Sequence, residues 1–142
     1  MKAYADASFL ISLYSPDANS PAAATTMRSS KGERYITVLC ELEVVNALEL
    51  RLFRKELSVS QAHSSLKDFE SDLRDGIFLL RPLSDQAFAR ARQLSRQTTA
   101  QLGTRTADLL HVAAALELGV DSIYSFDRQQ RKLAQAVRLK LN

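Results

Sequence analysis

The sequence predicts an α/β fold in which a mainly parallel sheet carries helices on both faces. Two observations lead to this expectation. Short segments rich in β-formers alternate with helix-length segments along the whole chain. Acidic residues also follow two of these short segments, where functional side chains collect in sheets of this kind. With 142 residues, the chain has the size of one domain, and we expect residues 1–142 to form a single one.

The chain begins with a short strand that ends at an acid, Lys2–Asp6. Apolar residues at helical spacing follow over Phe9–Tyr14. An alanine-rich segment then predicts a second helix, capped by Asp17 or Asn19 and running through Met27.

The next three elements are a strand and two longer helices. Arg34–Val38 contains Tyr, Ile, Thr and Val, which is typical of a strand. Leu39–Lys55 has no helix breaker and is apolar around most of its circumference, which predicts a helix buried on more than one side. Ser58 and Gln61 form a capping-box pattern, and we expect the helix that it opens to reach about Arg74.

Shorter elements follow in the second half of the chain. The expected strands are Ile77–Leu80, Ser122–Ser125 and an edge strand, Val137–Leu141, and the expected helices are Ser84–Thr98, Ala107–Leu118 and Arg128–Ala136. Asp75-Gly76 marks the turn before the first of these strands, and Gly119 ends the middle helix. Strands therefore alternate with helices to the end of the chain.

Composition limits the chemistry that this chain can perform. One cysteine, Cys40, excludes an internal disulfide and fits a reducing compartment, and we interpret its side chain as a small core residue. No apolar run approaches the roughly 18 residues that span a bilayer, so we expect a cytoplasmic protein without a membrane partner. Two histidines and one cysteine cannot form a common four-ligand zinc site, so any metal would be a hard cation held by oxygen.

The net charge of +3 is unevenly distributed. Residues 1–86 contain 10 Lys and Arg against 12 Asp and Glu, whereas residues 87–142 contain 9 against 4. A basic C-terminal part attracts a polyanionic partner such as a nucleic acid. An ordinary solvated surface explains the same charge equally well.

Four acids are candidates for a functional site, and each has a structural alternative. Asp6 and Asp127 follow predicted strands and could serve as helix N-caps, although Ser8 could cap the first helix and leave Asp6 free. Asp108 lies in the first turn of a predicted helix, where the helix dipole favours an anion. Glu43 and Glu41 lie in a largely apolar helix, and periodicity does not choose which of them lines a polar cleft.

Taken in order, four segments resemble the PIN-domain nucleases, and above all the VapC toxins of toxin–antitoxin pairs. These segments are Asp6-Ala7-Ser8-Phe9-Leu10, Glu43-Val44-Val45-Asn46-Ala47-Leu48, Thr106-Ala107-Asp108-Leu109-Leu110-His111-Val112-Ala113-Ala114-Ala115 and Ser125-Phe126-Asp127. The resemblance spans nearly the whole chain. It implies a three-layer α/β/α sandwich, PIN-like, with a central mainly parallel sheet.

The resemblance also implies the site and its chemistry. Its catalytic acids would be Asp6, Glu43, Asp108 and Asp127, with Asp6, Asp108 and Asp127 holding Mg²⁺ or Mn²⁺, and the pattern before Ala47-Leu48 favours Glu43 over Glu41. Ser8 and Ser125 would be hydrogen-bonding groups behind these acids. Apart from the resemblance, Arg105 and Arg128 lie close to Asp108 and Asp127 in the sequence and are candidates for contacts with substrate phosphates, as are Arg131 and Lys132. A solvated loop arginine explains Arg105 equally well. His111 is interpreted either as a proton shuttle or as a packed helix histidine.

The function that follows from the resemblance is a metal-dependent endoribonuclease, the toxin of a toxin–antitoxin pair. Its partners would be RNA, a cognate antitoxin bound near the apolar segment Leu39–Leu57, which includes Phe53, and a second copy of the chain in a homodimer. Core packing explains that apolar segment equally well. One alternative is a PIN-domain nuclease that processes RNA without an antitoxin. Another is a non-catalytic phosphoacceptor or binding module, which the run Ala7-Ser8 after Asp6 disfavours.

Overall fold

A computed structural model describes all 142 residues and contains one five-stranded sheet. The strands are β1 (Lys2–Ala5), β2 (Glu33–Thr37), β3 (Leu79–Arg81), β4 (Ser122–Tyr124) and β5 (Lys140–Leu141). Every neighbouring pair is parallel, in the order β3-β2-β1-β4-β5. The expected parallel sheet is confirmed, and β1 is its central strand.

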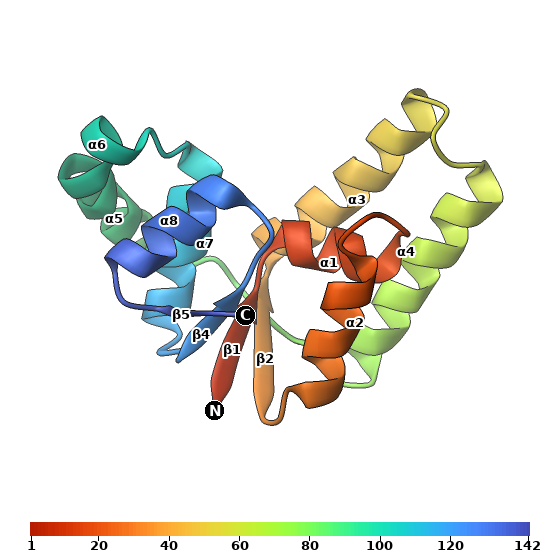
Figure 1. Cartoon of the computed structure of the whole chain (residues 1–142), viewed down its shortest axis with the longest axis horizontal. Coiled ribbons are helices and arrows are strands. Elements are labelled where there is room, and N and C mark those ends of the chain that lie inside the picture. Colours follow the sequence, from red (N-terminus) through yellow and green to blue (C-terminus); the bar gives the residue numbers. More distant parts are fainter.

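Helices connect the strands and cover both faces of the sheet, which makes the fold a three-layer α/β/α sandwich, as expected (Figure 1). They are α1 (Ala7–Tyr14), α2 (Ser20–Ser29), α3 (Val38–Phe53), α4 (Val59–Arg74), α5 (Asp85–Leu94), a π-helical turn η1 (Ser95–Thr99), α6 (Ala100–Leu102), α7 (Thr106–Glu117) and α8 (Arg128–Ala136). Helices α1 to α4 pack against one another, and α7 packs against α5 and α8. In Figure 1 the two groups lie on opposite sides of the central strands.

The core lies between the sheet and the helices. Strand β1 contributes fully buried Tyr4 and Ala5, and β2 and β4 contribute Ile36 and Ile123. Helix α7 is buried along most of its length, because every residue from Asp108 to Ala115 is covered. None of the helices combines the length and the apolar character needed to cross a membrane.

Two predicted strand starts differ from the structure by two or three residues, whereas the remaining strand ends differ by at most one. Strand β3 starts at Leu79 rather than Ile77, because the backbone N–H of Ile77 still bonds back to Asp72 in the last turn of α4. Strand β5 starts only at Lys140, because Leu139 donates to the carbonyl of Ala134 and so belongs to the end of α8. In both places the turn that ends a helix occupies residues with strand-like composition.

The helix expected over Ser84–Thr98 is interrupted. Regular α-helix stops at Leu94, and a π-helical turn and a short last turn continue to Leu102. The hydroxyl of Thr98 donates to the carbonyl of Leu94 at 2.6 Å, a side-chain bond that competes with the regular helix pattern. For α2, Asn19 occupies the N-cap position without a side-chain bond, while the Asp17 carboxylate accepts the Asn19 backbone N–H at 2.8 Å.

The strand order reverses beside β1, and this positions the site. The chain leaves β1 towards β2 and β3, and later returns to β4 on the other side of β1. Ala5 pairs with Tyr124, and the backbone N–H of Asp6 donates to the Tyr124 carbonyl at 3.1 Å. Loops at such a reversal diverge and leave a crevice at the carboxyl ends of the strands. The residues after β1 and β4 therefore leave the sheet side by side.

Candidate functional site

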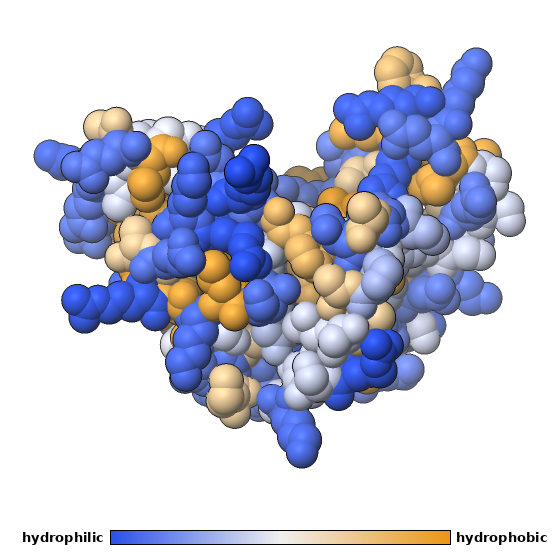
Figure 2. Space-filling model, viewed as in Figure 1, coloured by the Kyte–Doolittle hydropathy of each residue, from blue (hydrophilic) through white to orange (hydrophobic).

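A cavity of about 530 Å³ lies at this reversal, and the four predicted acids line it together with Ser8, Arg105 and Arg128. Ser125 is fully buried and does not line the cavity. Its charged lining residues are Asp6, Glu43, Arg105, Asp108, His111, Asp127 and Arg128. In the space-filling view, the molecule has a hollow between two lobes above the central strands, with strongly hydrophilic side chains on one of its sides (Figure 2). The four acids come from four separate parts of the chain, so tertiary folding assembles the pocket.

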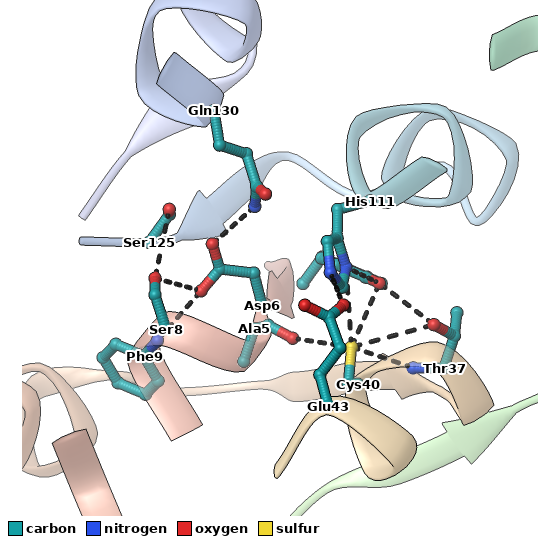
Figure 3. A network of polar contacts seen from close by, with 11 residues as sticks. Ala5, Asp6, Ser8, Phe9, Thr37, Cys40, Glu43, His111, Ser125 and Gln130 are labelled. Atoms are coloured by element: carbon teal, nitrogen blue, oxygen red, sulfur yellow. Dashed lines mark hydrogen bonds and ion pairs between the residues drawn. The ribbon is translucent and has the colours of Figure 1, made fainter. Parts of the chain in front are cut away.

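Asp6 is the most buried of the four acids, at 1% exposure. One carboxylate oxygen accepts the backbone N–H of Phe9 at 2.9 Å and the hydroxyl of Ser8 at 2.7 Å. The other accepts the side-chain amide of Gln130 at 2.5 Å (Figure 3). Asp6 is therefore the N-cap of α1, and the alternative in which Ser8 caps this helix is wrong. Asp6 lines the pocket as well as capping the helix.

The environment of Asp6 opposes its charge. Burial raises the pKa of the carboxyl above its ordinary value, because a charged group loses hydration in the interior. The positive charge of His111 and the hydrogen bonds from Ser8 and Phe9 act in the other direction and only partly offset burial. The protein thus has an acidic side chain at a position where its ionised form is disfavoured.

Asp127 and Asp108 are held at the starts of α8 and α7. Asp127 caps α8 by accepting the Gln130 backbone N–H at 2.9 Å, and its side chain is exposed. Asp108 is buried, and one oxygen accepts the Arg105 backbone N–H at 3.0 Å. Burial raises the pKa of Asp108, and the negative charge of Asp127 raises it further. These two carboxylates therefore repel each other within the same pocket.

Glu43, and not Glu41, lines the pocket. Its carboxylate is partly exposed and pairs with Nε2 of His111 at 2.5 Å. His111 itself is buried at 2% exposure. Burial lowers the pKa of His111, but its contacts with Cys40 and Glu43 raise it by more, so the net shift is upward. His111 is packed in the core and also contacts a pocket acid. This geometry is compatible both with a packed helix histidine and with a proton shuttle.

Ser8 and Ser125 connect the loops that carry Asp6 and Asp127. The hydroxyl of Ser125 accepts the backbone N–H of Asp127 at 3.1 Å. The hydroxyl of Ser8 accepts the backbone N–H of Phe126 at 2.9 Å and donates to Asp6. Each serine therefore supports an acid, and Ser8 also joins α1 to the loop after β4.

The arginines differ in their availability. Arg105 and Arg128 line the pocket, are exposed, and form no ion pair with a carboxylate. The guanidinium of Arg131 instead donates to the Ser125 carbonyl at 2.8 Å and to the side chain of Asn142 at 3.2 Å. Arg131 therefore joins the chain end to the loop after β4.

The carboxylate oxygens in the pocket are suitable ligands for a hard divalent cation, but they do not converge on a single position. No group of three or more Asp, Glu, His or Cys side chains is close enough together to hold an ion. Asp6, Asp108 and Asp127 nevertheless face one pocket with carboxylate oxygens, the ligands that Mg²⁺ and Mn²⁺ prefer. The mutual repulsion of Asp108 and Asp127 is the kind of interaction that a cation relieves.

The sequence patterns did not single out Gln130 and Tyr4. Gln130 is 3% exposed, lines the pocket and bonds Asp6. It shares the buried face of α8 with Leu133 and Ala134, and this spacing of three and four residues could have shown that a polar side chain points inward. Tyr4 is fully buried and bonds His111, and nothing in the spacing of β1 distinguishes it from an ordinary core residue.

Comparison with known proteins gives the family. The PIN domain family model matches residues 3–136. The fold is similar to that of VapC20 from Mycobacterium tuberculosis, described as a Sarcin-Ricin loop cleaving toxin, with a TM-score of 0.70, 14% identity, and coverage of 92% of this chain and 93% of that one. It is also similar to VapBC2 from Rickettsia felis bound to a DNA fragment from their promoter (TM-score 0.68, 16% identity, coverage 100% and 98%).

A third similar structure is FitAcB from Neisseria gonorrhoeae, with a TM-score of 0.67, 14% identity, and coverage of 98% of this chain and 95% of that one. At these identities the likeness shows a common fold. Among curated proteins, none matches the chain in sequence. The family model covers nearly the whole chain. The chain belongs to the PIN-domain family.

Proposed function

We propose that this chain is a metal-dependent endoribonuclease that acts as the toxin of a toxin–antitoxin pair. The observation that carries the proposal is the meeting of four acids, which follow β1, lie on α3 and α7 and precede α8, in one pocket at the strand-order reversal. Membership of the PIN-domain family supports it, as does a fold similar to that of toxins. The reaction would be hydrolysis of an RNA phosphodiester bond.

Asp6, Asp108 and Asp127 are the residues that would hold Mg²⁺ or Mn²⁺. When bound, such an ion supplies an activated water and a Lewis acid for the phosphate oxygens. Glu43 faces the same pocket from α3 and can accept a hydrogen bond or a proton from a water held there. Ser8 and Gln130 orient Asp6 through their hydrogen bonds, and Ser125 holds the loop before Asp127.

Arg105 and Arg128 would bind the RNA backbone. Both are exposed at the pocket without a carboxylate partner, so their charges are available for phosphate oxygens. Contacts of this type position a nucleic acid without reading its sequence.

RNA cleavage with Mg²⁺ or Mn²⁺ tests the proposed activity. Asp6→Asn and Asp108→Asn preserve side-chain size and remove one charge each, and we expect each to reduce the cleavage rate by at least about 100-fold. Glu41→Gln is the matched control, because Glu41 lies on α3 outside the pocket. If both asparagine variants cut RNA as fast as the wild type, the proposed mechanism is wrong.

Expression in cells separates a toxin from an RNA-processing nuclease. A toxin should arrest growth when it is produced alone, and coexpression of the protein encoded beside it should restore growth. Normal growth combined with RNA cleavage in vitro would favour the alternative, a PIN-domain nuclease without an antitoxin.

The exposed apolar side chains of α3 are the proposed antitoxin surface. Leu42 and Phe53 are 66% and 84% exposed, whereas Cys40, Val44 and Leu48 on the other side of the helix are buried. Large exposed apolar side chains on one helix face are typical of an interaction site. The homodimer implied by the resemblance is a second proposal, and the mass of the purified chain in solution tests it.

A further inference from the structure

A buried polar network lies behind the acidic pocket and connects three of its elements. The Tyr4 hydroxyl lies 2.8 Å from Nδ1 of His111, and Nε2 of His111 lies 2.5 Å from the Glu43 carboxylate. The same hydroxyl also contacts Thr37 and Cys40, each at 3.1 Å. The labelled members of this network appear together around Cys40 and Glu43 in Figure 3.

The network joins the elements that carry site acids. Tyr4 lies on β1 two residues before Asp6, and His111 lies on α7 one turn after Asp108. Glu43 lies on α3, three residues after Cys40. Because β1, α3 and α7 all contribute to the network, it couples the position of Glu43 to the elements that present Asp6 and Asp108.

The members of the network have little freedom to move. Tyr4, Thr37 and Cys40 are fully buried, and His111 is 2% exposed. No buried side-chain nitrogen or oxygen lacks a hydrogen-bond partner. Glu43, by contrast, is partly exposed and has a long side chain that other groups must hold in place. The side chain that bonds the Glu43 carboxylate is that of His111.

We propose that His111, held in turn by Tyr4, is a positioning residue that fixes the Glu43 carboxylate at the wall of the acidic pocket. This inference rests on the proposed nuclease function and adds a residue that acts through Glu43. The chain of bonds can be satisfied whether His111 is neutral or protonated, because the Tyr4 hydroxyl can donate or accept and Nε2–H donates to Glu43. The positive charge of a protonated His111 also favours the ionised forms of Asp6 and Asp108.

Nuclear magnetic resonance of the imidazole nitrogens tests the contact without any cleavage assay. The chain has two histidines, His111 and the exposed His63 on α4, so His63 is an internal reference. We expect Glu43→Gln to shift the His111 signals and leave those of His63 unchanged. Glu41→Gln should shift neither. If Glu43→Gln leaves the His111 signals in place, the proposal is overturned.

Kinetics then test positioning. His111→Leu removes the donor to Glu43 and should lower kcat by about 10–100-fold with little change in KM, as is typical when a partner behind a site residue is removed. His111→Gln keeps an N–H near the position of Nε2 and should recover most of the lost rate. His63→Gln is the matched control and should behave as the wild type.

A double variant distinguishes positioning from general weakening of the fold. If His111 acts through Glu43, His111→Leu should cost little further rate in a Glu43→Gln chain, because the two effects are not additive. Fully additive effects would overturn the proposal. Tyr4→Phe removes only the hydroxyl and should produce a smaller loss of rate of the same kind while keeping the buried ring.

The outcomes separate this inference from the proposed function. A wild type that cuts no RNA, with His111 signals that still respond to Glu43→Gln, would contradict the nuclease and retain the bond between His111 and Glu43. If the wild type cuts RNA and folded His111→Leu has the same kcat, the positioning role of His111 is contradicted and the proposed nuclease activity is retained. Thermal unfolding of each variant establishes whether that variant is folded.

Discussion

At Asp6, burial disfavours the negative charge that binding of a cation would require. Asp6 caps α1, bonds Ser8 and Gln130, and is almost completely buried. Burial raises its pKa, so the folded chain binds a proton at Asp6 more readily than the unfolded chain does. The contribution of Asp6 to stability is therefore largest below its unfolded pKa of about 3.9 and is lost as the pH rises through the raised folded value. At neutral pH its charge destabilises the fold.

Asp6→Asn should therefore stabilise the protein at pH 7 while it removes activity. Asparagine is also a good N-cap, and the Gln130 amide can rotate to bond it. Each kcal/mol gained should raise the unfolding temperature by roughly 3–5 °C. The difference from the wild type should disappear as the pH falls to about 3.9, where Asp6 is also neutral in the wild type.

Thermal unfolding of both proteins from about pH 3 to about pH 8 is the measurement, because it follows the difference through the whole titration of Asp6. Asp75→Asn, at an exposed position after α4, is the control and should not show this pH-dependent difference. An Asp6→Asn chain that melts below the wild type at pH 7 would contradict the assignment of an unfavourable buried charge.

Among the elements, α7 combines a structural and a proposed functional role. Its first turn presents Asp108 and its next turn presents His111, while Ala113, Ala114 and Ala115 are buried in sequence. Such a run of small residues allows the helix to be covered on nearly every side. A larger side chain there would displace the helix, and the acid and histidine would move with it.

Ala113→Leu should destabilise the fold by about 1–3 kcal/mol, because Ala113 is fully buried and the added atoms overpack the core. Ala89→Leu, at an exposed position of α5, is the matched control and should change stability by less than about 0.5 kcal/mol. Denaturant unfolding measures both. Equal stability of the two variants would contradict the tight packing that the burial of Ala113 indicates.

Helix α3 has two different faces, one in the core and one in solvent. Replacement of Phe53 by Ser should leave the fold intact, because Phe53 is 84% exposed, and should weaken binding of the proposed antitoxin by about 1–3 kcal/mol. Phe88→Ser is the matched control, since Phe88 is a half-exposed phenylalanine on α5. Calorimetric titration with the protein encoded beside this chain measures the difference. Equal affinities for both variants would exclude Phe53 from the interface.

Across the whole molecule, charge is divided between the two parts of the chain. Residues 87–142 carry the excess of positive charge, and Arg105 and Arg128 stand at the pocket. An acidic pocket with basic side chains at its edge attracts a polyanion and still provides carboxylates for a cation. The strand-order reversal brings both features to one place.

RNA binding should therefore depend on salt through these arginines. In an Asp108→Asn background, Arg105→Gln and Arg128→Gln should each weaken binding and reduce the slope of log K against log salt by about 0.7 for each phosphate of a single strand that the variant no longer neutralises. Arg74→Gln, at an exposed position at the end of α4, is the control. Binding measured from about 50 to about 300 mM salt tests this. Unchanged slopes in both pocket variants would contradict phosphate binding by these residues.

The sequence by itself determined the alternation of strands and helices and the parallel α/β class, because hydrophobic periodicity and capping residues act over a few neighbours. It also marked Asp6 and Asp127 as acids after strands. The family resemblance alone favoured Glu43 over Glu41, and the tertiary structure places Glu43 in the lining of the pocket. Only the tertiary structure decided that Tyr4 bonds His111 and that Gln130 bonds Asp6. The two residues of each of these hydrogen bonds lie far apart in the chain, and the same is true of His111 and Glu43. Local spacing carries no information about such distances, which are set by strand order and helix packing.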